Sequence, residues 1–429
     1  MRIRIEPVSR AFLIAALVHF LIGTTLGALM ASQVTWWDAL SPYHAELNPF
    51  GWLTFLIYGM TYAVLQLFAS LRVPWKGLPW LHFVAAEAGV VLIIFGDLLR
   101  RPLWVHWGWF FQTSAGILFL IAIISAVATS RKARKSQPTI SATEHLYVNS
   151  EMEWPASFAG FHVELKNDEI RDTDRVAKRG TSLALVVLIV ATLLASAEGI
   201  VKGGDPWLSS DRIRVLLYDG WIAGTVLSVS LHLFPRYRPT IAISPKIAQL
   251  AQSIWFIGIL LAGVLPPGWW LHRLGERAIG LSFAVLAAMY LIRMSSAMRQ
   301  AQQAVKLAWG IAWTFAFVLG ISQTFGLDPL SLPAIHLLFL GWITTLVYGV
   351  GYVFFPHLLR RAPAFARLAT PQVILSTVGA AMLILGMIGV GSGRNSLFND
   401  VLAIGGVSAT LGFFLFAMQW GMKRIAHED

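Results

Sequence analysis

Twelve apolar stretches, each about 20 residues long, constrain this chain more than any other feature of its sequence. An α-helix needs that length to cross the hydrocarbon core of a bilayer. The stretches lie near residues 11–31, 50–71, 82–98, 106–128, 181–201, 213–234, 247–265, 277–294, 306–326, 333–355, 371–391 and 400–421. Only 13% of the residues are charged, against about 25% in a soluble domain. We therefore predict an all-α membrane protein of twelve transmembrane helices in a lipid bilayer.

The positive charges indicate how the chain is oriented. With the N-terminus in the cytoplasm, most of the 33 Lys and Arg residues fall in cytoplasmic loops, as the positive-inside rule requires. We expect a multi-pass protein of the inner (plasma) membrane with both termini cytoplasmic. The net charge of +11 lies in loops beside the membrane and not on a soluble face, so we expect no nucleic-acid partner.

One hydrophilic insert divides a single integral membrane domain. Residues 1–128 hold the first four predicted helices, residues 129–180 form a basic linker, and residues 181–429 hold the other eight. The linker opens with the basic run 131–135, which favours a cytoplasmic segment docked on anionic lipid.

A signature occurs twice in the chain and partly a third time. Residues 51–62 and 341–352 share Gly-Trp-x-Thr-x-x-x-Tyr-Gly-x-x-Tyr at a constant offset of 290. A weaker copy begins at Gly220-Trp221, 121 residues before the last one. The copies fall on predicted helices 2, 6 and 10, which indicates three parallel four-helix units. Their glycines also suit close helix packing in lipid, whatever else they do.

Two histidines precede two of these copies. His44 lies seven residues before Gly51, and His336 lies five residues before Gly341. The chain has no cysteine, which excludes thiolate-bound metals and haem attached through Cys-x-x-Cys-His. Two imidazoles from different helices can instead clamp a haem iron from opposite sides. The alternative is that both histidines are interfacial and wet.

The two histidines do not match exactly in the repeat. The offset of 290 maps His336 onto Glu46, two residues after His44. Because Pro49 follows Asn48, we expect the second transmembrane helix to kink or begin there and to reposition His44.

These features resemble the haem-copper oxidase subunit I superfamily, especially C-type cytochrome c oxidases and the large subunits of nitric oxide reductases. Pro42-Tyr43-His44 and the His-x4-Gly-Trp motif at residues 336–342 carry the resemblance in sequence. It implies that fold, with His44 and His336 as the axial ligands of a low-spin haem b. It also implies an electron-donor or other respiratory subunit as partner.

The departures from that family bear on chemistry. Where the family has a high-spin haem ligand in helix 10, this chain has Ala334. Where the family has copper ligands in helices 6 and 7, Val215 and the histidine-free stretch 247–265 stand here. We therefore expect no copper and no complete oxygen or nitric oxide reductase in this chain alone. We expect electron transfer or a role with a diatomic gas.

Two other functions stay open. A transporter or respiratory assembly factor without cofactors predicts that polar residues face a shared cavity; the candidates are Gln66, Glu87, Gln252 and Gln323. The second is a role like that of the twelve-helix haem and copper proteins of the nitric oxide response, which residues 44–51 loosely resemble.

Several further residues have two interpretations each. His19, His82, His232 and His357 lie toward the predicted cytoplasmic half, where they predict either a second metal site or snorkelling side chains. Arg100 and Arg101, near His106, suit either haem propionates or lipid headgroups. Glu87 and Asp97 are acids inside one predicted span and make a weak case for a proton path.

Overall fold

A computed structural model shows that the described part of the chain is helical and contains no strand. It describes residues 6–68, 71–135, 168–202, 210–298, 301–358, 362–393 and 396–421. Eleven of its helices are long and apolar enough to cross a membrane. Large apolar side chains face outward along them, such as Ile14, Val18 and Ile22 on one helix. The chain is therefore a multi-pass membrane protein of α-helices.

Nine of the predicted spans form uninterrupted α-helices. They are α1 (Pro7–Ser32), α4 (Gly77–Leu98), α5 (Pro102–Lys135), α7 (Asp168–Lys202), α11 (Pro245–Val264), α12 (Trp270–Ala297), α13 (Gln303–Thr324), α16 (Ala369–Gly391) and α17 (Ser396–Gly421). The range predicted as a linker is partly helical, since α5 extends into it to Lys135 and α7 begins at Asp168. Its residues 136–167 lie outside the described part.

The other three spans are composite helices, each with a π-helical segment inside. They are α2 (Trp37–Glu46), η2 (Leu47–Thr54) and α3 (Phe55–Phe68); α9 (Asp211–Val215), η4 (Leu216–Ala223) and α10 (Gly224–Tyr237); and α14 (Leu332–His336), η6 (Leu337–Thr344) and α15 (Thr345–Leu358). Short 3₁₀ turns complete the elements at Val34–Trp36, Pro239–Ile241 and Ala366–Leu368.

The three π-helical segments occupy matching places in the sequence. Each is 8 residues long and contains the Gly-Trp pair of one copy of the signature. Their first residues, Leu47, Leu216 and Leu337, are separated by the same offsets as the Gly-Trp pairs. A π-turn is rare, but it is frequent at functional sites. Its recurrence distinguishes the three composite helices from the nine uninterrupted ones.

Of the two alternatives predicted at Pro49, the one in which the second transmembrane helix begins there is wrong, and a kink there stays a prediction. The helix begins at Trp37 and runs without a break through Pro49 to Phe68. Proline lacks an N–H and clashes with the carbonyl four residues earlier in an α-helix, but a π-turn bonds residues five apart. The hydroxyl of Thr54 donates to the carbonyl of Pro49 at 2.9 Å. The π-turn thus lets the helix continue through the proline.

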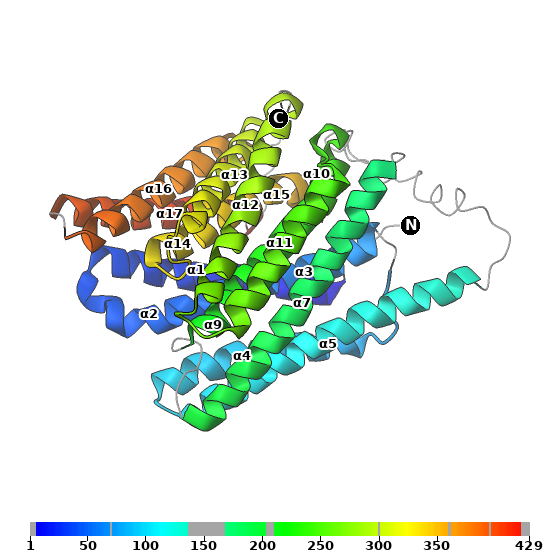
Figure 1. Ribbon diagram of the computed structural model, residues 1–429, viewed down its shortest axis with the longest axis horizontal. Coiled ribbons are helices and arrows are strands. Elements are labelled where there is room, and N and C mark those ends of the chain that lie inside the picture. Colours follow the sequence, from blue (N-terminus) through cyan, green and yellow to red (C-terminus); the bar gives the residue numbers. More distant parts are fainter. Residues whose placement is uncertain are drawn as a thin grey trace, which may run out of the picture.

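The composite helices form the interior of the molecule. In the apolar sections of Asp211–Tyr237 and Leu332–Pro356, 83% and 72% of the residues are buried, against 33–50% in the other nine spans. In Figure 1 the paths from α2 to α3, from α9 to α10 and from α14 to α15 run in the same general direction.

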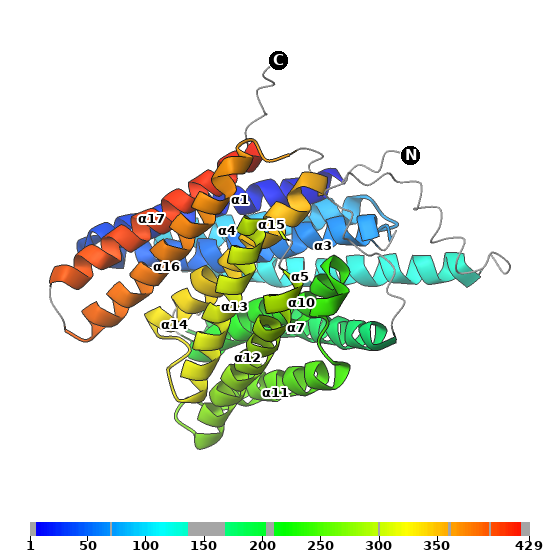
Figure 2. The same cartoon turned by 90° about the horizontal axis from the view of Figure 1, so that it is seen from above.

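The same neighbours recur around each composite helix. The helix before each π-segment packs against it, which pairs α1 with η2, α7 with η4 and α13 with η6. The two spans after each composite helix pack on each other, which pairs α4 with α5, α11 with α12 and α16 with α17. In Figure 2 the α16–α17 pair and the α11–α12 pair lie on opposite sides, with α13 and α15 between them.

A group of charged side chains joins α7 to α10. Asp174, whose side chain is 11% exposed, accepts two hydrogen bonds from the guanidinium of Arg236, at 2.8 and 3.2 Å. It also contacts the imidazole of His232 and, at 3.2 Å, the ammonium of Lys178. Removing one partner from a buried ion pair leaves the others without compensation.

We predict that Asp174→Asn destabilises the protein while a nearby carboxylate does not matter. Asp172 pairs with Arg175 on the exposed side of α7, so Asp172→Asn is the matched control. Asp174→Asn should lower the free energy of unfolding by about 3–5 kcal/mol, and Asp172→Asn by less than about 1 kcal/mol. The measurement is the thermal unfolding midpoint in detergent. Equal midpoints for the two variants would contradict the prediction.

Candidate functional site: two facing histidines in a membrane cavity

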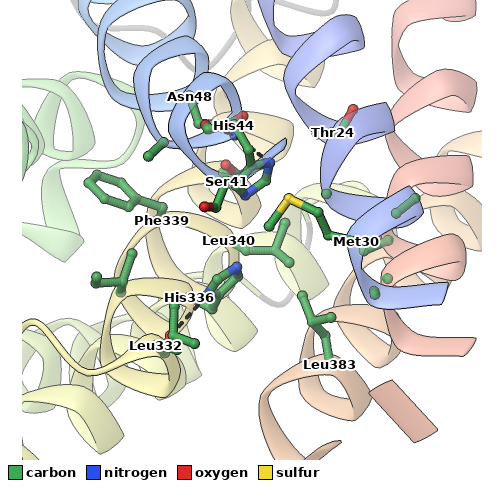
Figure 3. A pocket seen from close by; sticks show the side chains of 18 of the residues that line it. Thr24, Met30, Ser41, His44, Asn48, Leu332, His336, Phe339, Leu340 and Leu383 are labelled. Carbon is green, nitrogen blue, oxygen red and sulfur yellow. Dashed lines mark hydrogen bonds between the residues drawn. The ribbon is translucent and has the colours of Figure 1, made fainter. Parts of the chain in front are cut away.

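A cavity of about 250 Å³ lies among six spans of the bundle. Residues of α1, of the composite helices at His44 and His336, and of α16 and α17 line it, and α9 and η4 add Arg214 and Tyr218. Figure 3 shows His44 and His336 on different sides of this space, with the thioether of Met30 pointing toward them. The structure therefore brings together the two histidines that the sequence singled out, although they are 292 residues apart.

The planes of the two imidazoles are nearly parallel. Their ring centroids lie 6.2 Å apart and their planes differ by 13°. An imidazole nitrogen on a metal ion sits about 2 Å from it. A centroid separation of 6.2 Å therefore leaves room for one metal ion between the two rings.

Hydrogen bonds to the backbone define the tautomer of both rings. Nδ1 of His44 lies 2.7 Å from the carbonyl of Gly23, and Nδ1 of His336 lies 2.8 Å from the carbonyl of Leu332. Nδ1 of His44 also lies 3.2 Å from the amide nitrogen of Asn48. The shorter contact of each Nδ1 is to a carbonyl, which can only accept, so we assign the hydrogen to both Nδ1 atoms. The Nε2 lone pair is then available, which is the usual arrangement of a metal-binding histidine.

Two glycines of α1 make room for His44 and its neighbour. A Cβ at position 27 would come within 2.6 Å of the His44 ring, and one at position 23 within 2.8 Å of the Asn48 side chain. The Asn48 amide donates to the carbonyl of His44 at 2.8 Å. Close approach of α1 therefore orients the His44 ring, and the sequence pattern shows this only as an ordinary small-residue pair.

His336 is oriented by its own helix. It is the last residue of α14, and its partner Leu332 is the first. Glu46, which the repeat offset matches to His336, is buried and is not among the residues that line the cavity. The two histidines reach the cavity from different helices and different directions, so they need no equivalent register.

The cavity is much larger than a bare metal ion requires. A water-sized occupant needs about 10–15 Å³, against about 250 Å³ here. Within the described residues, no group of three or more His, Asp or Glu side chains could hold a metal ion. Two imidazoles with space between them fit a metal whose remaining ligands come from a bulky, apolar cofactor.

The cation at this cavity is Arg214, which the sequence analysis did not select. Arg214 lines the cavity, its Nε has no hydrogen-bond partner, and one Nη donates to Asp211. Arg100 and Arg101 are exposed and do not line the cavity. The available signal was an arginine close to the start of the most buried span.

The remaining predicted residues lie in other places. His82 is fully buried and its Nδ1 bonds the hydroxyl of Tyr62 at 2.9 Å, His19 contacts Glu87, and His232 belongs to the Asp174 group. The side chain of His357 lies outside the described part. The described histidines His19, His82 and His232 each have a different partner, and a second metal site stays a prediction.

The positions that depart from the oxidase pattern carry apolar side chains. Ala334 on α14 and Val215 at the end of α9 are both fully buried. The helix α11 contains no histidine between Pro245 and Val264.

We predict that a side chain at position 27 disturbs His44, whereas one at Gly310 is harmless. Around Gly310 no atom lies within 4 Å of an added Cβ, so Gly310→Val controls for the loss of a helical glycine. Gly27→Val should lower the free energy of unfolding by about 1–3 kcal/mol relative to that control, through overpacking. Thermal unfolding in detergent measures it, and equal midpoints would show that the ring has free space.

Comparison with known proteins adds no family to this geometry. No protein-family model matches the chain, and no curated protein matches it significantly.

Proposed function

We propose that this chain is a haem protein of the membrane, with one low-spin haem b held between His44 and His336, and that it transfers electrons. The observation that carries the proposal is the pair of nearly parallel imidazoles, with ring centres 6.2 Å apart, in a cavity between helices. A bound haem would supply one-electron oxidation and reduction of its iron. Held by His44 and His336 together, the haem would transfer electrons and would not take up a gas.

The residues of this chain would perform four tasks. His44 and His336 would donate Nε2, and the carbonyls of Gly23 and Leu332 would hold their rings in place. Ring contacts of Phe20 and Trp52 would exclude water from one wall, where their centroids are 4.4 Å apart. Haem b also carries carboxylate groups, and a guanidinium is the preferred partner of a carboxylate.

Arg214 is the side chain that suits such a carboxylate. Its guanidinium already shares one Nη with Asp211 and retains an unpartnered Nε at the cavity. A buried donor without an acceptor is unfavourable by about 1–3 kcal/mol. A carboxylate at this edge of the cavity would satisfy it.

The scaffold we propose is three parallel four-helix units, as in oxidase subunit I. In its support, three π-segments recur at the offsets of the signature, and the same helix contacts recur around each. With the N-terminus cytoplasmic, both histidines would lie near the outer face. An electron-donor subunit would then dock on that side.

The transporter alternative has less support here. Of its proposed polar residues, Gln252 bonds Ser228 and Glu87 contacts His19, while Gln323 packs against Gly280. The side chain of Gln66 lies outside the described part. The other three belong to separate helix contacts, and none of them lines the cavity.

The test is a reduced-minus-oxidised absorbance spectrum of protein purified with haem supplied. We expect the sharp bands of low-spin haem in the wild type and at least about tenfold less bound haem in His44→Ala and His336→Ala, because each removes an axial ligand. His272→Ala is the control, since His272 contacts Glu276 away from the cavity. If the low-spin haem bands remain in both folded variants, His44 and His336 are not the haem ligands.

Arg214→Gln should leave the low-spin bands in place but weaken haem retention. A hydrogen bond to a charged group contributes about 1.5–3 kcal/mol, so transfer of haem to an acceptor protein should be about 10- to 100-fold more favourable. Arg212→Gln is the control, because Arg212 shares α9 but does not line the cavity. Equal haem retention in the two variants would show that Arg214 is not part of the site.

A further inference from the structure

His19 and Glu87 form an ionisable pair between two helices of the bundle and outside the cavity. His19 lies within α1, is 7% exposed, and places Nε2 3.2 Å from Oε1 of Glu87 on α4, whose side chain is 34% exposed on the surface of the bundle. The other carboxylate oxygen of Glu87 is buried without a hydrogen-bond partner. Ionisable groups within membrane spans are costly and usually functional.

The contacts of His19 favour a proton between it and Glu87. Nδ1 of His19 lies 3.0 Å from the carbonyl of Gly51, which can only accept, so Nδ1 carries a hydrogen. Nε2 and the carboxyl oxygen can then form a hydrogen bond only if one more proton lies between them. Imidazolium with carboxylate and imidazole with carboxylic acid both meet this condition, and both are neutral overall. Without that proton, two lone pairs would face each other inside the membrane.

Packing alone does not call for a histidine at this place. The glycine of the signature meets the preceding helix at His19 in the first copy, where an added Cβ would lie 2.8 Å from the imidazole. The same glycine meets Val187 in the second copy and Phe315 in the third. Apolar side chains fill the same contact in two of three cases, so the histidine and its acid are a specific feature of the first.

The pair is adjacent to the cavity. The residues that follow His19 and Gly51 are Phe20 and Trp52, whose rings stack at 4.4 Å with planes 3° apart, and both line the cavity. The contact between α1 and η2 therefore has the His19–Glu87 pair on one side and the cavity on the other. In this medium of low dielectric constant a change of charge in the cavity acts strongly on the pair.

Other ionisable groups on the neighbouring elements are engaged elsewhere or lie near helix ends. Tyr58, Tyr62 and His82 form a separate cluster around Phe12. His44 faces the cavity. Those near helix ends are Glu6, Arg10, Asp38, Asp97, His106 and Asp400. Tyr43 and the buried Glu46 lie within the composite helix that carries Gly51, and Glu46 has a contact of its own.

We propose that His19 and Glu87 form a one-proton binding site within the membrane, coupled to the charge of the occupant of the neighbouring cavity. The coupling rests on the proposed function, whereas the proton site does not. An electron added to a haem in the cavity favours the proton on the pair, and by linkage a bound proton favours the electron. The midpoint potential of the haem should therefore fall as the pH rises.

The first test uses infrared difference spectra at pH 7 of the full chain in lipid nanodiscs, with or without haem. Wild type minus Glu87→Gln should show a protonated carboxyl, or wild type minus His19→Val should show an imidazolium. Asp38→Asn is the control, because exposed Asp38 should show an ionised carboxylate. An ionised Glu87 together with a neutral His19 would overturn the proton site. If His19→Val does not fold, His19→Gln, which can still donate to the Gly51 carbonyl, replaces it.

The second test is the pH dependence of the midpoint potential in haem-loaded protein. The slope should be present in the wild type and in Asp38→Asn, and should be lost in Glu87→Gln and His19→Val. A slope that persists in both variants, or is absent in the wild type, overturns the coupling. If the protein binds no haem, the proposed function fails, and the infrared spectra still decide the proton site.

Discussion

The close contact between α1 and the composite helix of α2 and η2 is the interaction on which the site depends. Two side chains bond backbone carbonyls across it, His44 to Gly23 and His19 to Gly51. Helices in lipid gain little from the hydrophobic effect and associate through close packing and hydrogen bonds. Small residues are therefore as important here as the histidines, because a Cβ at position 27 or 51 would enter an imidazole ring. The cavity and the His19–Glu87 pair lie on the two sides of this contact.

The π-helical segments give the three composite helices the same backbone shape, although the side chains at the contact differ. The wider turn occurs at the Gly-Trp pair in each composite helix, and the preceding helix packs against it. The side chain at that contact is His19, Val187 or Phe315. The same π-helical backbone thus packs against a polar His–Glu pair in the first copy and against apolar side chains in the other two. Strict equivalence of side chains is not required, which also explains why His44 and His336 need not share a register.

Some of the site could be predicted from the sequence, and some could not. The histidines were evident because each precedes a repeated motif at similar depth in a predicted span. Arg214 was not evident, since a basic residue near a span end ordinarily indicates a headgroup contact. The π-turn at Pro49 was also missed. Proline normally ends or kinks a helix, and the local sequence does not predict a π-turn.

The sequence by itself determined that the chain crosses a membrane as α-helices, because a long apolar stretch in lipid must satisfy its backbone within the segment. It also determined which residues could ligate a metal, since the absence of cysteine left few donors. The tertiary structure decided that His44 faces His336 at 6.2 Å, that Arg214 reaches their cavity, and that His19 meets Glu87. These are contacts between helices distant in the chain, and their geometry depends on helix packing, which local patterns do not encode.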